Sequence, residues 1–154
     1  KYNIRIPSSN VIDICSGTGA LGIEALSRGA GLIYFIDKDT KAINVLQKNI
    51  EKLKIENKDK TYIKIIKEDA LKALQEIKIV FDVVLIDPPY NSNVIEECLV
   101  KLKQYKLIDF NSYIFAESDK KENFNFDGFD LLDTKIYGKS KLTILKLFNS
   151  SSVE

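Results

Sequence analysis

Short apolar blocks alternate with helix-like stretches along this 154-residue chain, and this alternation restricts the fold more than any other feature. The run from Phe81 to Ile86 is almost wholly apolar, which is typical of strands that are covered on both faces, as in a parallel sheet. The same reasoning predicts strands at Val11–Cys15, Gly31–Ile36, Tyr62–Lys67, Val80–Ile86 and Ser112–Ala116. Apolar residues at helical spacing predict helices at Ala20–Arg28, Thr40–Leu53, Asp69–Ile77 and Asn93–Lys106.

The end of the chain breaks this alternation. Two strand-like runs, Phe129–Tyr137 and Leu142–Phe148, are separated only by Gly138–Lys141, and so short a connection predicts an antiparallel hairpin. We therefore predict a doubly wound α/β fold, with a mostly parallel seven-stranded sheet that ends in an antiparallel C-terminal hairpin. Residues 1–148 would form one domain, and residues 149–154 a tail.

Composition excludes several classes of function. The chain has two cysteines and no histidine, so zinc sites built from several His or Cys ligands and Ser-His-Asp or Cys-His catalysis are excluded, and we predict no metal. A net charge of +1 provides no overall field that attracts nucleic acid. No apolar run approaches the roughly 20 residues of a membrane span, and two distant cysteines suit a reducing compartment. We expect a cytoplasmic protein that does not associate with membranes.

A glycine-rich turn follows the first predicted strand. Gly17 and Gly19 allow backbone conformations closed to other residues, and the next helix points unpaired N–H groups toward a ligand above the sheet. Asp37 ends the second predicted strand, where a carboxylate can accept both hydroxyls of a ribose. This pattern predicts a nucleotide site, but it also matches the NAD fingerprint.

Two further acids favour S-adenosylmethionine over a dinucleotide. Asp13 precedes Gly17 by four residues, and its carboxylate could hold the cationic end of the cofactor indirectly or brace the turn. A pyrophosphate would be repelled by a carboxylate at this place. Asp69 follows the third predicted strand, where it could accept from an adenine amino group beside Ala70; it could also cap the next helix.

The most specific motif is Asp87-Pro88-Pro89-Tyr90, directly after the fourth predicted strand. The prolines make the backbone rigid at the carboxyl end of the sheet, where open α/β folds bind ligands. A carboxylate, the Pro88 carbonyl and an aromatic plane together suit a flat group that carries an NH₂. Holding that amine in line with a methyl donor would accelerate transfer through placement and fixed dipoles.

The run from Asp13 to Ala30, DICSGTGALGIEALSRGA, resembles the opening of the RsmD family, and Asp87–Tyr90 resembles the catalytic motif of that family. These enzymes use S-adenosylmethionine to methylate the exocyclic N2 amine of a guanine in small-subunit (16S) ribosomal RNA. The resemblance extends to Tyr137–Ser140 in the terminal hairpin. Cys15-Ser16 stands where the family commonly has Phe-Ala, and Asp37 where it often has glutamate.

The resemblance implies rRNA methyltransferase activity, with ribosomal RNA or the small ribosomal subunit as partner. Catalytic residues would be Asp87, Pro88, Pro89 and Tyr90. The cofactor-binding residues would be Asp13, Ser16, Gly17, Thr18, Gly19, Asp37, Lys38, Asp69, Ala70 and Asp87. Family members carry a further basic segment upstream, so we expect this chain to lack an N-terminal segment. We also expect a monomer.

Several alternatives remain at this point. The same motif could serve a DNA adenine or a protein glutamine, and the glycine pattern alone would allow an NAD-dependent oxidoreductase. A non-catalytic nucleotide-binding or RNA-binding module is also possible. We expect Cys15 and Cys98 to be core residues rather than nucleophiles. Lysines of the hairpin could contact phosphates: Lys135, Lys139, Lys141 and Lys146.

Overall fold

The computed structural model describes residues 6–53 and 61–150. Within them a single seven-stranded sheet has the order β3-β2-β1-β4-β5-β7-β6. The strands are β1 (Asn10–Ile14), β2 (Leu32–Asp37), β3 (Tyr62–Lys67), β4 (Val83–Ile86), β5 (Tyr113–Asp119), β6 (Phe129–Tyr137) and β7 (Ser140–Leu147). The helices are α1 (Ala20–Ser27), α2 (Thr40–Glu51), α3 (Ala70–Glu76) and α4 (Val94–Gln104). The predicted doubly wound α/β fold is confirmed.

The first five strands are parallel, and the chain reverses its direction of travel across the sheet between β1 and β4. Within the sheet, β2 and then β3 lie on one side of β1, and β4 and then β5 lie on its other side. In an open α/β sheet this reversal opens a crevice beyond the carboxyl ends of the central strands. Both predicted motifs follow strands at this point, since the glycine turn follows β1 and Asp87 follows β4.

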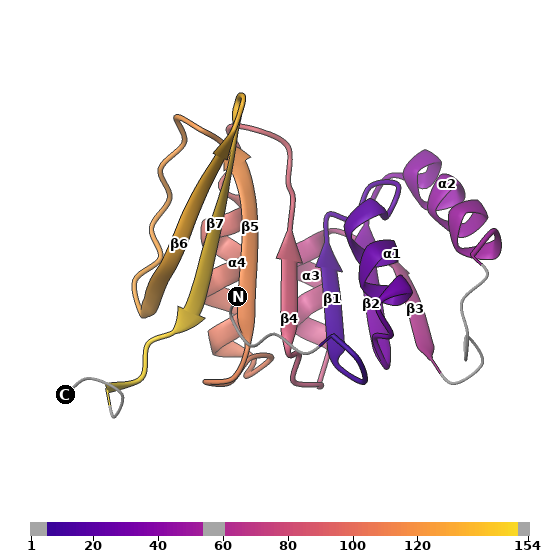
Figure 1. Ribbon diagram of the computed structural model, residues 1–154, viewed down its shortest axis with the longest axis horizontal. Coiled ribbons are helices and arrows are strands. Elements are labelled where there is room, and N and C mark those ends of the chain that lie inside the picture. The colour runs from indigo at the N-terminus through magenta and orange to yellow at the C-terminus, as the bar shows by residue number, and fades with distance from the viewer. Residues whose placement is uncertain (1–5, 54–60, 151–154) are drawn as a thin grey trace.

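The helices cover the two faces of the sheet, with α1 and α2 on one face and α3 and α4 on the other (Figure 1). Each face has its own apolar cluster. Phe35 and Leu46 are buried with α1 and α2, whereas Phe81 and Leu99 are buried with α3 and α4. Central strands with apolar residues on both faces therefore pack against helices on both sides, as the continuous apolar runs predicted.

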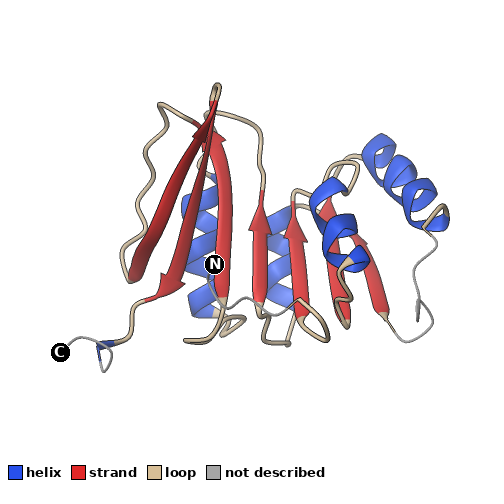
Figure 2. Cartoon of the chain, viewed as in Figure 1, coloured by secondary structure: helices blue, strands red, loops and turns tan. Residues whose placement is uncertain are grey.

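The antiparallel hairpin is also confirmed, and Figure 2 shows it as the last two strands at one side of the sheet. β7 lies between β5 and β6 and pairs antiparallel with both. Its connection is shorter than predicted: Tyr137 pairs with Ser140, which leaves a loop of only Gly138 and Lys139. Ser140 and Lys141 belong to β7 because they also pair with the end of β5.

Several strand boundaries differ from the predicted ones, and the largest shifts, of three residues, are at the start of β4 and the end of β5. The fourth strand begins at Val83 instead of Val80. The Phe81 amide donates to the Leu107 carbonyl, and Asp82 exchanges hydrogen bonds with Asn10 through its amide and its side chain, outside the assigned parallel ladder. The fifth strand continues to Asp119, because β7 pairs with it along this added length. Over the described residues, none of the helices combines the length and the apolar character that crossing a membrane would take.

Candidate functional site

A cavity of about 560 Å³ lies at the carboxyl ends of the central strands. Both predicted motifs contribute to its walls: Gly17 and Asp37 stand on one side, and Asp87, Pro88 and Pro89 on another. The glycine turn and the proline loop therefore share one crevice, as the hypothesis of methyl transfer requires. A second hollow, of about 720 Å³, lies between α4 and the segment before β6 and contains none of the predicted site residues.

Asp37 holds the glycine turn in place from the end of β2. The Gly17 amide, in a left-handed conformation with φ of 56°, donates to Asp37 Oδ2 over 2.8 Å. The Asp39 amide donates to Asp37 Oδ1 over 2.9 Å. A carboxylate has about four acceptor positions, so two backbone donors leave room for the hydroxyls of a ribose.

Asp13 supports the glycine turn from the buried interior and does not line the cavity. Its side chain is 1% exposed, and Asp13 Oδ2 accepts from the Gly22 amide over 3.0 Å. The pKa of Asp13 is raised to about 7: burial contributes most, the Gly22 hydrogen bond acts against it, and the nearby carboxylates of Asp87 and Asp37 add to the rise. Of the two roles that the sequence suggested, the geometry supports the bracing one.

Asp69 caps α3 and faces the cavity at the same time. Its Oδ2 accepts from the amides of Leu71 and Lys72, over 3.2 and 3.4 Å. Because both capping bonds use Oδ2, the cap does not occupy Oδ1. Ala70 and Leu71 continue the wall beside it. The two interpretations of Asp69, as a cap and as a cofactor ligand, are compatible in this geometry.

The Asp87-Pro88-Pro89 segment forms another part of the cavity wall. The Asp87 amide donates to the Ile14 carbonyl over 3.3 Å, which anchors the loop to the end of β1. The pKa of Asp87 is raised, first because the cavity walls remove part of its water and then because Glu117 adds a like charge. A carboxylate with a raised pKa is a stronger hydrogen-bond acceptor while it stays ionised.

The predicted site residues fall into two groups. Eight line the cavity: Gly17, Asp37, Lys38, Asp69, Ala70, Asp87, Pro88 and Pro89. The other five lie outside its lining: Asp13, Ser16, Thr18, Gly19 and Tyr90. Gly19 caps α1, and the Thr18 carbonyl accepts from the Asn49 side chain. Tyr90 is 48% exposed, and its hydroxyl contacts Ser140.

Cys15 was expected to be a core residue, yet it lines the cavity with a half-buried side chain. Burial raises the pKa of its thiol to about 11, and neighbouring carboxylates contribute. A thiol with this pKa stays protonated near neutral pH, so the prediction that Cys15 is not a nucleophile fits the geometry. Cys98 is buried in the core, as predicted.

The sequence motifs did not point to the apolar walls of the cavity or to two of its acids. Ile36, Leu71 and Val94 provide apolar surface, and Asp39 and Glu68 add carboxylates. All five lie within seven residues of a predicted site residue, at a strand end or in the first turns of a helix. Position after a parallel strand was the available signal, because the carboxyl ends of such strands meet at one edge.

The charge of the cavity is strongly one-sided. Among residues 6–53 and 61–150, five carboxylates line it, from Asp37, Asp39, Glu68, Asp69 and Asp87, against one ammonium, that of Lys38. Some of this negative charge is compensated by backbone N–H groups, as at Asp37. The cavity therefore favours a cationic ligand with a flat apolar part and disfavours a pyrophosphate.

The strand order, the antiparallel C-terminal strands and the cavity at the reversal point are those of the Rossmann-like fold of class I methyltransferases. Solved structures with this fold align with most of the chain. A chain from Streptococcus pyogenes described as a conserved hypothetical protein has a TM-score of 0.81 at 28% identity, covering 92% of this chain and 88% of its own. The chain belongs to the family described as Conserved hypothetical protein 95, which matches residues 2–146.

Curated relatives carry a more specific name. The "Ribosomal RNA small subunit methyltransferase D" of Buchnera aphidicola is 34% identical over 119 residues, which are 77% of this chain and 60% of that protein. The protein of the same name from Haemophilus influenzae is 35% identical over 115 residues, 75% of this chain and 59% of its own length. The chain thus spans about 60% of each of these relatives.

Proposed function

We propose that this chain transfers a methyl group from S-adenosylmethionine to the exocyclic N2 amine of a guanine in small-subunit ribosomal RNA, in the cytoplasm. One observation carries the proposal: an acid-rich cavity contains the glycine turn and the Asp87-Pro88-Pro89 loop together. The names of the relatives support the ribosomal substrate.

The residues of the cavity fit the cofactor on chemical grounds. Asp37 would accept from the ribose, Asp69 and Ala70 would face the adenine, and Ile36 with Leu71 would provide apolar contact for its ring. The surplus of carboxylates would stabilise the positive charges of the amino and sulfonium groups. When bound, the cofactor supplies an electrophilic methyl group.

The role of the proline loop follows from the electronic structure of the target. An exocyclic amine on a base is a poor nucleophile, because its lone pair is delocalised into the ring. If Asp87 and the Pro88 carbonyl accept its two hydrogens, they fix the nitrogen and direct its lone pair into the cavity. The loop backbone is set by its prolines and tied to Ile14, so this placement costs little reorganisation.

The first test measures cofactor binding. Isothermal titration calorimetry should show that S-adenosylhomocysteine binds to the chain, whereas NADH should bind far more weakly, because its pyrophosphate would enter a cavity with five carboxylates. Binding of NADH with similar or higher affinity would favour an oxidoreductase and contradict the proposal.

The second test measures the substrate. Unmodified 16S rRNA, small-subunit particles and DNA are incubated with the chain and the tritiated methyl donor, and nuclease digests are then analysed for the methylated nucleoside. We expect label in N2-methylguanosine from the ribosomal substrates. Label in adenine of DNA would replace the proposed substrate, and RNA binding without any label would indicate a non-catalytic module.

A further inference from the structure

The loop that follows β4 is fastened to the tip of the C-terminal hairpin, although the two lie about 50 residues apart in the chain. Figure 1 shows this loop running from β4 toward the tip of β6 and β7. Tyr90 Oη and Ser140 Oγ lie 2.7 Å apart, a hydrogen bond in which either hydroxyl can donate. The contact is close to the ideal O–H···O length.

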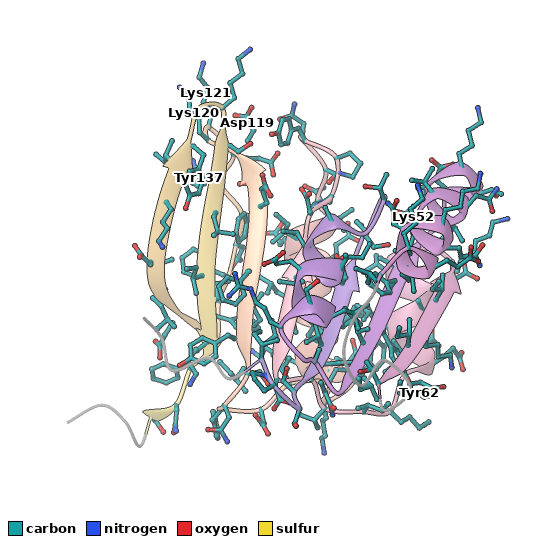
Figure 3. The ribbon with its side chains drawn as sticks, turned by 45° about the vertical axis from the view of Figure 1, so that its right-hand side comes forward. Lys52, Tyr62, Asp119, Lys120, Lys121 and Tyr137 are labelled. Carbon is teal, nitrogen blue, oxygen red and sulfur yellow. The ribbon has the colours of Figure 1, made fainter. Side chains whose placement is uncertain are left out.

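A second connection runs through the segment after β5. The Asn91 amide donates to the carboxylate of Glu122, and Lys141 Nζ donates to the Glu122 carbonyl over 2.6 Å. The Lys120 amide donates to the Lys139 carbonyl over 2.8 Å. Figure 3 shows Asp119, Lys120 and Lys121 at this end of β5, beside the hairpin tip. Three segments are thus held together next to the cavity.

The loop itself leaves Tyr90 few alternatives. Asn91 has a φ of 61°, the left-handed conformation that asparagine tolerates better than most residues. Ser92 Oγ donates to the Pro89 carbonyl over 2.8 Å and closes the turn. Between these fixed points Tyr90 is 48% exposed, and its hydroxyl contacts Ser140 from the hairpin.

We propose that Ser140 is a positioning residue, which holds the exposed ring of Tyr90 and, together with Glu122 and Lys141, fixes the Asp87–Asn91 loop for the target base. This inference rests on the proposed function. The Tyr90 ring presents a flat surface at the rim of the site, and its tether comes from the hairpin. The hairpin therefore does more than close the sheet: it sets the geometry of the site that receives the base.

This arrangement also changes the interpretation of the hairpin lysines. Lys141 is engaged with Glu122, and Lys146 Nζ lies 4.5 Å from the centroid of the Tyr113 ring. These two lysines serve contacts within the protein. Lys139, in the two-residue loop, remains the lysine of the tip that the predicted phosphate contact would use.

The first test follows the ring directly. All seven tyrosines of the chain are replaced by 3-fluorotyrosine. The fluorine NMR resonance of Tyr90 is then assigned as the one that is missing from the Tyr90→Phe variant. In Ser140→Ala we expect this resonance to move toward the value of a free tyrosine and to sharpen, while Ser140→Thr keeps the original shift. An unchanged resonance in Ser140→Ala would overturn the proposal.

The second test separates placement of the base from folding and cofactor binding. In Ser140→Ala we expect kcat/KM for 16S rRNA to fall about three- to tenfold, as the loss of one hydrogen bond implies. Affinity for S-adenosylhomocysteine and the thermal unfolding midpoint should stay the same, and Ser140→Thr should restore most of the rate. Ser27→Ala is the matched control, because it removes a hydroxyl from α1 that bonds only to the Ile23 carbonyl.

The outcomes distinguish the two levels of inference. If the unsubstituted chain methylates no RNA, the proposed function fails, and the fluorine spectra still decide whether Ser140 holds the ring. If the unsubstituted chain is active and Ser140→Ala keeps its full kcat/KM, the positioning role is wrong. A rate that falls only because cofactor affinity falls would also contradict it, since neither Tyr90 nor Ser140 lines the cavity.

Discussion

The two loops that line the cavity are held in opposite ways. The glycine turn after β1 is fixed from below by carboxylates that accept backbone N–H groups, at Asp13 and Asp37. The Asp87–Asn91 loop after β4 is fixed at its rim by side chains from the C-terminal hairpin and the segment before it. The turn thus has a support in the buried interior, at Asp13, and one at the cavity wall, at Asp37. The loop, besides its anchor to Ile14, has exposed contacts across the surface.

This difference in support suits two different roles for the glycine turn and the Asp87–Asn91 loop. Under the proposed function, the turn would bind a cofactor that is the same in every cycle, so a rigid support built from residues 13–37 would suffice. Under the same proposal the loop would receive a large substrate, and its contacts to Ser140 and Glu122 are exposed. We therefore expect substitutions near the turn to change stability and cofactor affinity, and substitutions near the loop to change transfer.

The largest effect should come from Asp87. Replacement by alanine removes the carboxylate that would accept from the target amine, and we expect kcat for methyl transfer to fall at least about a hundredfold. Affinity for S-adenosylhomocysteine should stay nearly unchanged. Tritium incorporation into 16S rRNA and calorimetry measure the two quantities.

Asp130→Ala is the control for this substitution, because it deletes a carboxylate from β6 outside the cavity. Its activity should equal that of the unsubstituted chain. If Asp87→Ala still transferred methyl groups at a similar rate, the role assigned to the loop would be wrong, and the division of work between the two loops with it.

A pH experiment probes the support of the turn. Since the pKa of Asp13 is about 7 in the folded protein and 3.8 in the reference state, the folded state binds more protons between these values. The free energy of unfolding should therefore contain a contribution from Asp13 that is fully present below about pH 4 and is lost as the pH rises through 7. Its slope is at most about 1.4 kcal/mol per pH unit.

Asp13→Asn keeps an acceptor for the Gly22 amide and removes the titration. Urea denaturation from pH 4 to pH 8 should show a smaller decline for Asp13→Asn than for the unsubstituted chain. Parallel curves would mean that ionisation of Asp13 is not disfavoured in the folded state, and that another group carries the pH dependence.

The contrast between the loops also explains which parts could be predicted. The fold and the turn follow from residues adjacent in sequence: the alternation, the glycines, and the capping carboxylate of Asp69. The tether of Tyr90 could not be predicted in this way, because Ser140 meets it only after β7 has paired with β5. Likewise, the exclusion of Ser16 and Tyr90 from the cavity lining depends on side-chain direction, which spacing does not encode.

Packing under the turn should give the next largest effect. A Cβ at Gly22 would lie 2.3 Å from Phe35 Cε1 and 2.8 Å from Asp13 Oδ2, both inside the closely packed interior. We expect Gly22→Ala to lower the free energy of unfolding by about 1 to 3 kcal/mol, measured by urea denaturation. The matched control is Gly138→Ala in the hairpin, where nothing lies within 4 Å of the added atom and only the φ of 57° opposes it. Because Gly22 has no positive φ, its loss would come from packing, whereas that of Gly138 would come from backbone strain alone. A Gly22→Ala variant as stable as the unsubstituted chain would contradict close packing under the turn.

The smallest effect concerns Ser16, whose Oγ is buried with no hydrogen-bond partner among the described residues. Removal of an unsatisfied buried hydroxyl relieves its desolvation, so Ser16→Ala should raise the free energy of unfolding by up to about 1 kcal/mol. Because Ser16 lies outside the cavity lining, affinity for S-adenosylhomocysteine should not change. If that affinity falls instead, the hydroxyl pairs with the ligand after all, as the sequence predicted, and the turn binds with a side chain as well as its backbone. Thermal unfolding with and without S-adenosylhomocysteine distinguishes these results in one experiment, since a variant that can no longer hydrogen-bond to the ligand gains less stability from binding it.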